Sequence, residues 1–253
     1  MKYTAIVLAG TRPGRDAFAE QFGAELKALI PVGGEPMVRR PVGALLASKN
    51  IGDIIVLAQD PERIVDALPD DARIKLRKSD ATIASTMLAL CFDRQTEWPL
   101  LVTTADHALL DSETIDEFCS GADGDISIGV VERQTLLQRF GNAKRTWLKF
   151  RGGAYTGANL FALRSPKVAG AIELWRSVES ERKKGWRVVS LLGPFTLIGT
   201  VLRLLSIDGV LANIGRRLGL TITAVRLSNP VAGIDVDKAA DHELAEAIIA
   251  GRA

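Results

Sequence analysis

The chain has 253 residues, of which 47% are hydrophobic and 25% are charged, and its formal net charge is +2. This length suits one large α/β domain or one domain with a small appendage, and the ordinary composition argues against a disordered chain. The two cysteines, Cys91 and Cys119, are too few for a disulfide framework or a zinc site. The apolar run at residues 1–10 is too short for a signal peptide, so we expect a cytoplasmic protein with reduced cysteines.

Strand-like and helix-like patterns alternate along most of the chain. In chain order they predict a strand at 3–8, a loop at 11–35, a helix at 37–48, a strand at 51–58, a helix at 61–68, a strand at 73–76, a helix at 85–92, a strand at 100–104, a helix at 112–119, strands at 126–131, 147–150 and 157–163, a helix at 166–184, a strand at 221–227 and a helix at 239–250. Such alternation is typical of a mainly parallel sheet covered by helices on both faces. Because ligands bind these sheets at the carboxyl ends of the strands, the segments that follow residues 8 and 104 should lie along one edge.

The segment at 188–202 contains no charged residue, and its 15 residues fall short of the roughly 20 needed to cross a bilayer. Its pattern favours a pair of helices that are either buried or form an oligomer interface. A homo-oligomer is therefore one expectation. A helix that lies on a membrane surface is the alternative. We therefore expect a single domain over residues 1–253, with a helical insertion at about 165–220.

Basic residues are concentrated in one part of the chain. Residues 133–217 contain 16 Lys and Arg against 4 Asp and Glu, for a net charge of +12, whereas residues 1–132 carry −8. A cationic segment attracts anions such as phosphates or anionic lipids. One interpretation is a basic wall for a phosphorylated acceptor, formed by the arginines nearest Gly157, which are Arg151 and Arg164. The others are peripheral contact with a membrane and ordinary solvated surface charge; we expect no nucleic-acid partner.

The first candidate site follows the predicted strand at 3–8. The strand leads into a glycine-containing turn, whose backbone N–H groups can cradle phosphate oxygens. Arg15 and Lys27 add fixed positive charge for a phosphate in transit and a departing pyrophosphate. The sequence here is neither a Walker A motif nor a dinucleotide-binding fingerprint, and glycine turns without a ligand are common.

Aspartates mark two further candidate sites. Asp106 follows the strand at 100–104, where a carboxylate can bridge a hard cation to phosphate oxygens. Asp235 and Asp237 alternate in a turn before the last helix, which Asp241 would cap or support. The alternatives are structural, namely an Asx turn or helix N-cap for Asp106 and an acidic first helical turn for the later aspartates.

Taken together, these motifs resemble those of the MobA-like nucleotidyltransferases, a family of NTP transferases. The resemblance covers roughly residues 3–164 and 221–250. It implies a Rossmann-like three-layer α/β/α sandwich of the nucleotidyltransferase type, with a mixed and mostly parallel sheet. It also implies a reaction in which a nucleoside monophosphate passes from CTP, GTP or UTP to a small phosphorylated acceptor, with Mg²⁺ as cofactor and release of pyrophosphate.

The resemblance also assigns roles to individual residues. Arg15 and Lys27 would be catalytic residues that hold the triphosphate, and Asp106 and Asp237 would hold Mg²⁺ with help from Asp235. The nucleotide would contact residues of the glycine turn and one serine that comes later in the chain. The turn residues are Leu8, Ala9, Gly10, Thr11, Arg12 and Gly14, and the serine is Ser85.

The acceptor would contact the segment around Gly157 and Asn159. Two structural alternatives are open, because Ser85 can be a helix N-cap and the segment at 156–159 can be a hairpin turn.

Two other functions are open at this point. A glycosyltransferase of the related fold would use the aspartates to hold the metal of a nucleotide sugar, but it would not need the pair Arg15 and Lys27. A non-catalytic module that binds nucleotides or docks on membranes could dispense with Asp106 and Asp237. The presence of all four residues favours a nucleotidyltransferase.

Overall fold

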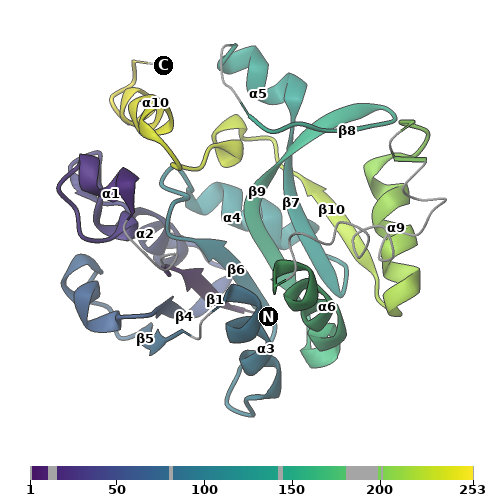
Figure 1. Ribbon diagram of the computed structural model, residues 1–253, viewed down its shortest axis with the longest axis horizontal. Coiled ribbons are helices and arrows are strands. Elements are labelled where there is room, and N and C mark those ends of the chain that lie inside the picture. Colours follow the sequence, from purple (N-terminus) through teal and green to yellow (C-terminus); the bar gives the residue numbers. More distant parts are fainter. Residues whose placement is uncertain are drawn as a thin grey trace.

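A computed structural model describes residues 2–10, 16–79, 82–141, 145–180, 199–200 and 202–252. The strands are β1 (Tyr3–Leu8), β2 (Pro31–Val32), β3 (Glu35–Pro36), β4 (Ile51–Ala58), β5 (Ile74–Lys78), β6 (Leu100–Thr104), β7 (Ile126–Glu132), β8 (Leu148–Phe150), β9 (Gly153–Leu163) and β10 (Ile222–Arg226). Eight of them form one sheet in the order β10-β7-β9-β6-β1-β4-β5, with β8 paired to β9 (Figure 1). The strands β2 and β3 form a separate hairpin.

Helices pack on both faces of the large sheet (Figure 1). The described helices are α1 (Ala17–Gln21), α2 (Arg39–Ala47), α3 (Ile83–Phe92), α4 (Ser112–Gly121), α5 (Arg133–Arg139), α6 (Ala169–Ser180), α9 (Ile207–Leu218) and α10 (Ala239–Ile249). Ile6 of β1 belongs to the buried cluster that includes Met87 of α3 and Ile172 of α6. Its neighbour Ala5 belongs to the cluster on the other face, with Leu45 of α2 and Phe118 of α4.

Successive residues of a strand point to opposite faces, which explains why the strands here are continuous apolar runs rather than alternating ones. The predicted three-layer α/β/α sandwich is confirmed.

The carboxyl ends of the parallel strands define one edge of the sheet, which we call the carboxyl edge. β1 is parallel to both β4 and β6, and Leu8 at its end lies opposite Leu57 and Thr104. β9 is antiparallel to β6 and β7, so it begins at the carboxyl edge, where Tyr155 lies opposite Glu132. The segments after β1 and β6 therefore lie side by side, as the order of elements predicted.

Local details differ from the sequence-based predictions. The predicted helix at 61–68 consists of two 3₁₀ turns, Pro61–Arg63 and Val65–Ala67. The predicted loop at 11–35 contains α1, which Asp16 caps by accepting hydrogen bonds from the N–H groups of Phe18 and Ala19. The sequence interpretation also missed α5 (Arg133–Arg139), whereas α9 lies within the predicted helical insertion. Single helical turns and short helices carry too few residues for a clear period, so their formation depends on contacts with the rest of the protein.

The predicted helix at 166–184 begins as a 3₁₀ turn, Pro166–Val168, and continues as α6, whereas residues 181–184 lie outside the described residues. The described part of the predicted insertion at about 165–220 is mainly α6 and α9, and the assignment of one domain stays a prediction.

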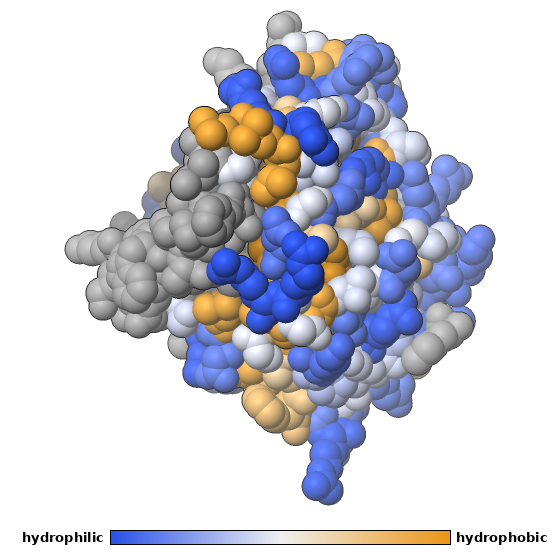
Figure 2. Space-filling model, turned by 90° about the vertical axis from the view of Figure 1, so that its right-hand side faces the viewer, coloured by the Kyte–Doolittle hydropathy of each residue, from blue (hydrophilic) through white to orange (hydrophobic). Residues whose placement is uncertain are grey.

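Most of the uncharged run at 188–202 also lies outside the described residues. On the face of the molecule that includes α9, hydrophobic groups reach the surface among hydrophilic ones (Figure 2). Leu202 and Leu204 are 60% and 58% exposed. None of the described helices is both long enough and apolar enough to cross a membrane.

Gly233 lies in the segment that leads to Asp235, and a Cβ atom there would meet Thr156 Cγ2 at 2.8 Å and Leu136 Cδ1 at 2.9 Å. We expect Gly233→Ala to lower the free energy of unfolding by about 1–3 kcal/mol, the cost of overpacking a buried site. Urea unfolding followed by circular dichroism measures the change. Gly43→Ala in α2 is the matched control, because its Cβ would meet nothing within 4 Å and Ala favours a helix by about 1 kcal/mol. A Gly233→Ala protein as stable as the wild type would contradict the prediction.

Candidate active site

Asp106 is held at the carboxyl edge by backbone hydrogen bonds on both sides. The N–H group of Ala105 donates to the carbonyl oxygen of Leu8 at 3.0 Å, which ties the end of β6 to the end of β1. The N–H group of Val236 donates to the carbonyl oxygen of Asp106 at 3.0 Å. The segment before α10 is therefore fastened directly beside Asp106, which brings Asp237 to the same place.

Lys27 joins these two aspartates. It lies in a 3₁₀ turn, Lys27–Leu29, and its Nζ donates to Asp106 Oδ2 at 2.6 Å and to Asp237 Oδ1 at 2.5 Å. The lysine side chain is 23% exposed, and those of Asp106 and Asp237 are 20% and 60% exposed. Three residues that the sequence predicted for one site thus lie in direct contact.

The contact shifts the ionisation of both partners. Burial alone would lower the pKa of Lys27, but the charges and hydrogen bonds of Asp106 and Asp237 outweigh burial and raise it above its usual value. Burial would raise the pKa of Asp237, but its hydrogen bond and ion pair with Lys27 hold it below the usual range. The ammonium and the carboxylate are both charged at neutral pH.

Thr104 and His107 are the neighbours of Asp106 in the sequence that flank its side chain. Its second oxygen, Oδ1, accepts a hydrogen bond from Thr104 Oγ1 at 2.5 Å. Burial lowers the pKa of the adjacent His107 to about 4, so its ring is neutral. The alternative in which Asp106 caps a helix is wrong, because the N-cap of α4 is Asp111.

Asp235 has different partners from Asp237. Arg145 Nη1 donates to Asp235 Oδ1 at 2.6 Å, and Arg145 Nη2 lies 3.2 Å from Asp241 Oδ1. The side chains of Arg145 and Asp241 are only 9% and 7% exposed. Burial and the charge of Asp237 raise the pKa of Asp235, and Arg145 opposes them. The other oxygen of Asp241 accepts the N–H group of Asp237 at 3.3 Å, so this buried ion-pair network positions the segment that carries Asp237.

The predicted nucleotide-binding residues divide into two groups. Leu8, Ala9 and Gly10 lie at the end of β1, beside the end of β6. Thr11, Arg12, Gly14 and the predicted catalytic residue Arg15 lie outside the described residues. Ser85 lies in the first turn of α3, where its N–H group donates to Thr82 Oγ1 at 3.1 Å. Thr82 is thus the N-cap, and the N-cap alternative for Ser85 is wrong.

The predicted acceptor residues Gly157 and Asn159 lie within β9 rather than in a turn, so the hairpin alternative is wrong. Asn159 has a φ of 48°, in the left-handed region, next to a register shift between Ile128 and Val130 of β7. Asn tolerates this conformation better than most residues. Its Nδ2 atom lies 3.5 Å from Asp235 Oδ2, which places Asn159 beside the acidic segment.

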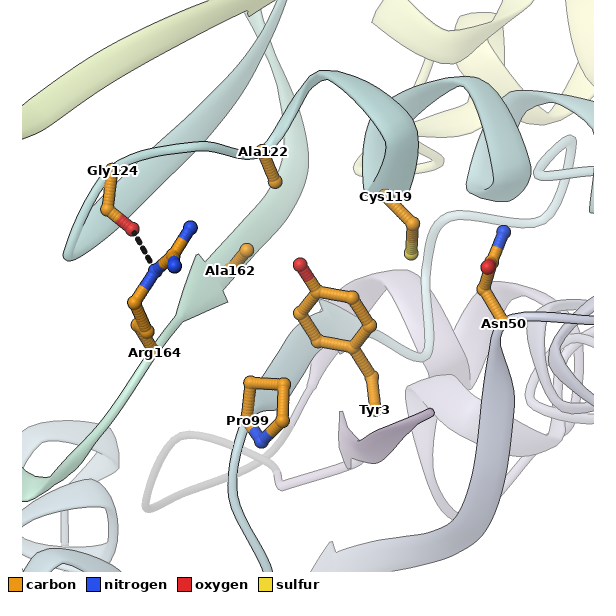
Figure 3. A pocket seen from close by; sticks show the side chains of 8 residues that line it. All are labelled: Tyr3, Asn50, Pro99, Cys119, Ala122, Gly124, Ala162 and Arg164. Carbon is orange, nitrogen blue, oxygen red and sulfur yellow. Dashed lines mark hydrogen bonds between the residues drawn. The ribbon is translucent and has the colours of Figure 1, made fainter. Parts of the chain in front are cut away.

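A cavity of about 250 Å³ lies at the edge of the sheet opposite the carboxyl edge (Figure 3). Its lining residues are Tyr3, Asn50, Pro99, Cys119, Ala122, Gly124, Ala162 and Arg164. There Arg164 donates to the carbonyl oxygens of Gly124 and Asp123 at 3.2 and 3.0 Å. The expectation that Arg164 lies with Gly157 beside the acceptor is therefore wrong, because β9 carries the chain from Gly157 to the opposite edge, where Arg164 follows its last residue. Burial raises the pKa of Cys119 to about 12, so this thiol stays protonated.

The sequence interpretation missed Arg145 and Thr104. Nothing in the local sequence singles out Arg145, which is one of 16 basic residues between 133 and 217. Thr104 was recognisable only as the last residue of a strand. Arg145 is recognised by its contact with Asp235, and Thr104 by its contact with Asp106. Both contacts are known only from the fold.

The fold and this cluster at the carboxyl edge define a Rossmann-like α/β protein of the nucleotidyltransferase type. A comparison with family models matches residues 5–183 to the MobA-like NTP transferase domain. The chain belongs to this family and is a nucleotidyltransferase. The family resemblance predicted from the motifs is confirmed.

Solved structures agree with this assignment. A hypothetical transferase from Thermus thermophilus has a TM-score of 0.80 and 30% identity, over 96% of this chain and 100% of that one. The 4-diphosphocytidyl-2C-methyl-D-erythritol synthase of Anaerococcus prevotii has a TM-score of 0.61 and 12% identity, over 98% and 96%. A CMP:2-keto-3-deoxy-manno-octonic acid synthetase complexed with CTP has a TM-score of 0.60 and 11% identity, over 100% of both chains. At such low identity the last two support the fold alone. No curated protein matches the chain.

The ion pairs of Arg145 with Asp235 and Asp241 should contribute to the stability of the fold. We expect Arg145→Met to lower the free energy of unfolding by about 3 kcal/mol, because it leaves two carboxylates without their cation in a mostly buried site. Chemical denaturation measures the loss. The control is the triple variant Arg145→Met, Asp235→Asn, Asp241→Asn, which removes the unpaired charges and should recover much of the stability. Equal losses in the single and triple variants would contradict this account.

Proposed function

We propose that the protein transfers a nucleoside monophosphate from CTP, GTP or UTP to a small phosphorylated acceptor, with release of pyrophosphate and dependence on Mg²⁺. The observation that carries this proposal is the ammonium of Lys27 between the carboxylates of Asp106 and Asp237 at the carboxyl edge. Such a cluster offers oxygen ligands for a divalent cation and a positive group for phosphates in one place. Family membership supplies the class of reaction.

Asp106 and Asp237 suit Mg²⁺ because this ion prefers oxygen ligands and is commonly held by one or two carboxylates together with substrate phosphates. Among the described residues no group of three or more His, Cys, Asp and Glu side chains could hold a metal ion. When bound, Mg²⁺ would neutralise charge on the phosphates of the nucleotide. Asp235, the third predicted ligand, contacts Arg145 and Asn159, and we assign it a supporting role.

The reaction is an in-line displacement at the α-phosphorus. An oxygen of the acceptor phosphate forms the new bond, and the bond to the bridging oxygen of the leaving pyrophosphate breaks. An acceptor phosphate is already an anion at neutral pH, so no protein base has to activate it. Lys27, together with Arg15, would stabilise the charge that develops on the pyrophosphate, and residues 8–10 would lie beside the nucleoside.

CTP is the first nucleotide to test, because one compared synthetase is described as a complex with CTP and another as forming a diphosphocytidyl product. Asn159 and Gly157 mark the expected side for the acceptor. A cytoplasmic location, a homo-oligomer and contact of the basic segment 133–217 with a membrane stay predictions.

Product analysis separates the proposal from its alternatives. Incubation with each NTP, Mg²⁺ and a panel of phosphorylated small molecules should release pyrophosphate. A nucleotide-sugar-dependent glycosyltransferase would instead release a nucleotide from a nucleotide sugar, and a non-catalytic module would bind nucleotide without releasing any product.

We expect Asp106→Asn and Asp237→Asn each to reduce turnover by about 10²-fold or more, because each removes a charged ligand for the cation. Pyrophosphate release over a range of Mg²⁺ concentrations measures the loss. Asp123→Asn, which makes the same change at the opposite edge, is the control and should leave turnover unchanged. Wild-type rates at low Mg²⁺ in either variant would exclude that residue from the metal site.

Lys27→Ala should reduce turnover by about 10²–10³-fold, the scale expected when one preorganised charged group is lost from the site. The matched control is Lys49→Ala, since the Lys49 side chain is 80% exposed and precedes β4 at the opposite edge. Unchanged turnover and nucleotide affinity in Lys27→Ala would show that this lysine has no part in the reaction.

A further inference from the structure

The ammonium of Lys27 lies where a divalent cation shared by Asp106 and Asp237 would lie. One oxygen of each carboxylate points at the same nitrogen, at 2.6 and 2.5 Å. Mg²⁺ binds carboxylate oxygens at about 2.0–2.1 Å, so an ion bridging these two atoms would overlap the ammonium. Lys27 and the ion cannot both occupy the place between the two carboxylates.

The lysine is suited to leave this place, whereas the neighbouring arginine is not. Lys27 is a compact charge on a flexible four-carbon stem, and its partner Asp237 is 60% exposed. Arg145 binds Asp235 and Asp241 from a site where it is only 9% exposed. Solvent and ligands can therefore reach the Lys27 pair far more easily than the Arg145 network.

We propose that Lys27 is a place-holding cation that closes the metal site in the nucleotide-free protein and moves to the triphosphate when nucleotide binds. A divalent ion without nucleotide must displace the ammonium from both carboxylates, so it binds weakly. When the ion arrives with a triphosphate, the phosphate oxygens give Lys27 new anionic partners. Binding of the ion to the carboxylates and movement of Lys27 to the triphosphate then favour each other. The role of the triphosphate rests on the proposed function, whereas the competition between lysine and metal rests on the contacts alone.

The competition can be tested with Mn²⁺ alone, in the absence of nucleotide and acceptor. Electron paramagnetic resonance of free Mn²⁺ gives the dissociation constant for the wild type and for Lys27→Met. We expect Lys27→Met to bind one Mn²⁺ about tenfold or more tightly than the wild type, because it leaves two neighbouring carboxylates without a cation. Lys49→Met, with the same loss of charge at the opposite edge, should bind Mn²⁺ like the wild type.

Two further variants make the outcome decisive. Lys27→Met combined with Asp237→Asn should lose the gain in affinity, which would locate the added ion between the two carboxylates. Lys27→Gln removes the charge but keeps a polar hydrogen-bond donor on a slightly shorter side chain, so it gives the same test if Lys27→Met does not fold. A Lys27→Met or Lys27→Gln protein that binds Mn²⁺ no more tightly than Lys49→Met would overturn the proposal.

Failure of this proposal differs from failure of the proposed function. A gain in Mn²⁺ affinity without turnover of any NTP would support the place-holding lysine and count against the transferase reaction. Turnover in the wild type without a gain in Mn²⁺ affinity in the Lys27 variants would support the transferase reaction and overturn the place-holding lysine.

Discussion

Two carboxylates directed at one point repel each other unless a cation lies between them, and this constraint organises the carboxyl edge of the sheet. Asp106 follows the central strand β6, and Asp237 precedes the last helix, so the fold brings together charges from distant parts of the chain. The ammonium of Lys27 lies within 2.6 Å of an oxygen of each. The lysine thereby ties the segment after β1, the centre of the sheet and the start of α10 into one unit.

The acidic turn before α10 uses its two alternating aspartates differently. Val236 between them is fully buried and donates its N–H group to Asp106, which fixes the turn. Asp235 pairs with the buried guanidinium of Arg145, whose planar fork holds its partners in a fixed geometry. Asp237 pairs with Lys27, a mobile point charge. The first pair therefore suits a permanent support, and the second suits a contact that ligands can exchange.

The sequence predicted the architecture well because the strands are long apolar runs and the chain alternates strands with helices. It also predicted that Lys27, Asp106 and Asp237 belong to one site. The strand order placed Asp106 at the carboxyl edge, and the family motifs supplied Lys27 and Asp237. The sequence could not predict Arg145, because the contact with Asp235 spans 90 residues and leaves no local pattern. The two 3₁₀ turns at 61–67 were interpreted as one helix for a related reason, since a short segment has too few residues to reveal its period.

Basic residues that are close together in the sequence at 133–217 lie at different places in the fold. Residues 133–217 carry +12 in sequence, but the 11-residue strand β9 runs antiparallel through the middle of them. At about 3.4 Å per residue such a strand is on the order of 35 Å long, so residues at its two ends serve opposite edges. Arg145 pairs with Asp235 and Asp241, and Arg164 donates to backbone carbonyl oxygens beside the cavity at the opposite edge. Of the described basic residues in this segment, those near the start of β9 lie on the side of Asn159 and Arg164 does not. A phosphorylated acceptor beside Asn159 would therefore meet the former rather than Arg164.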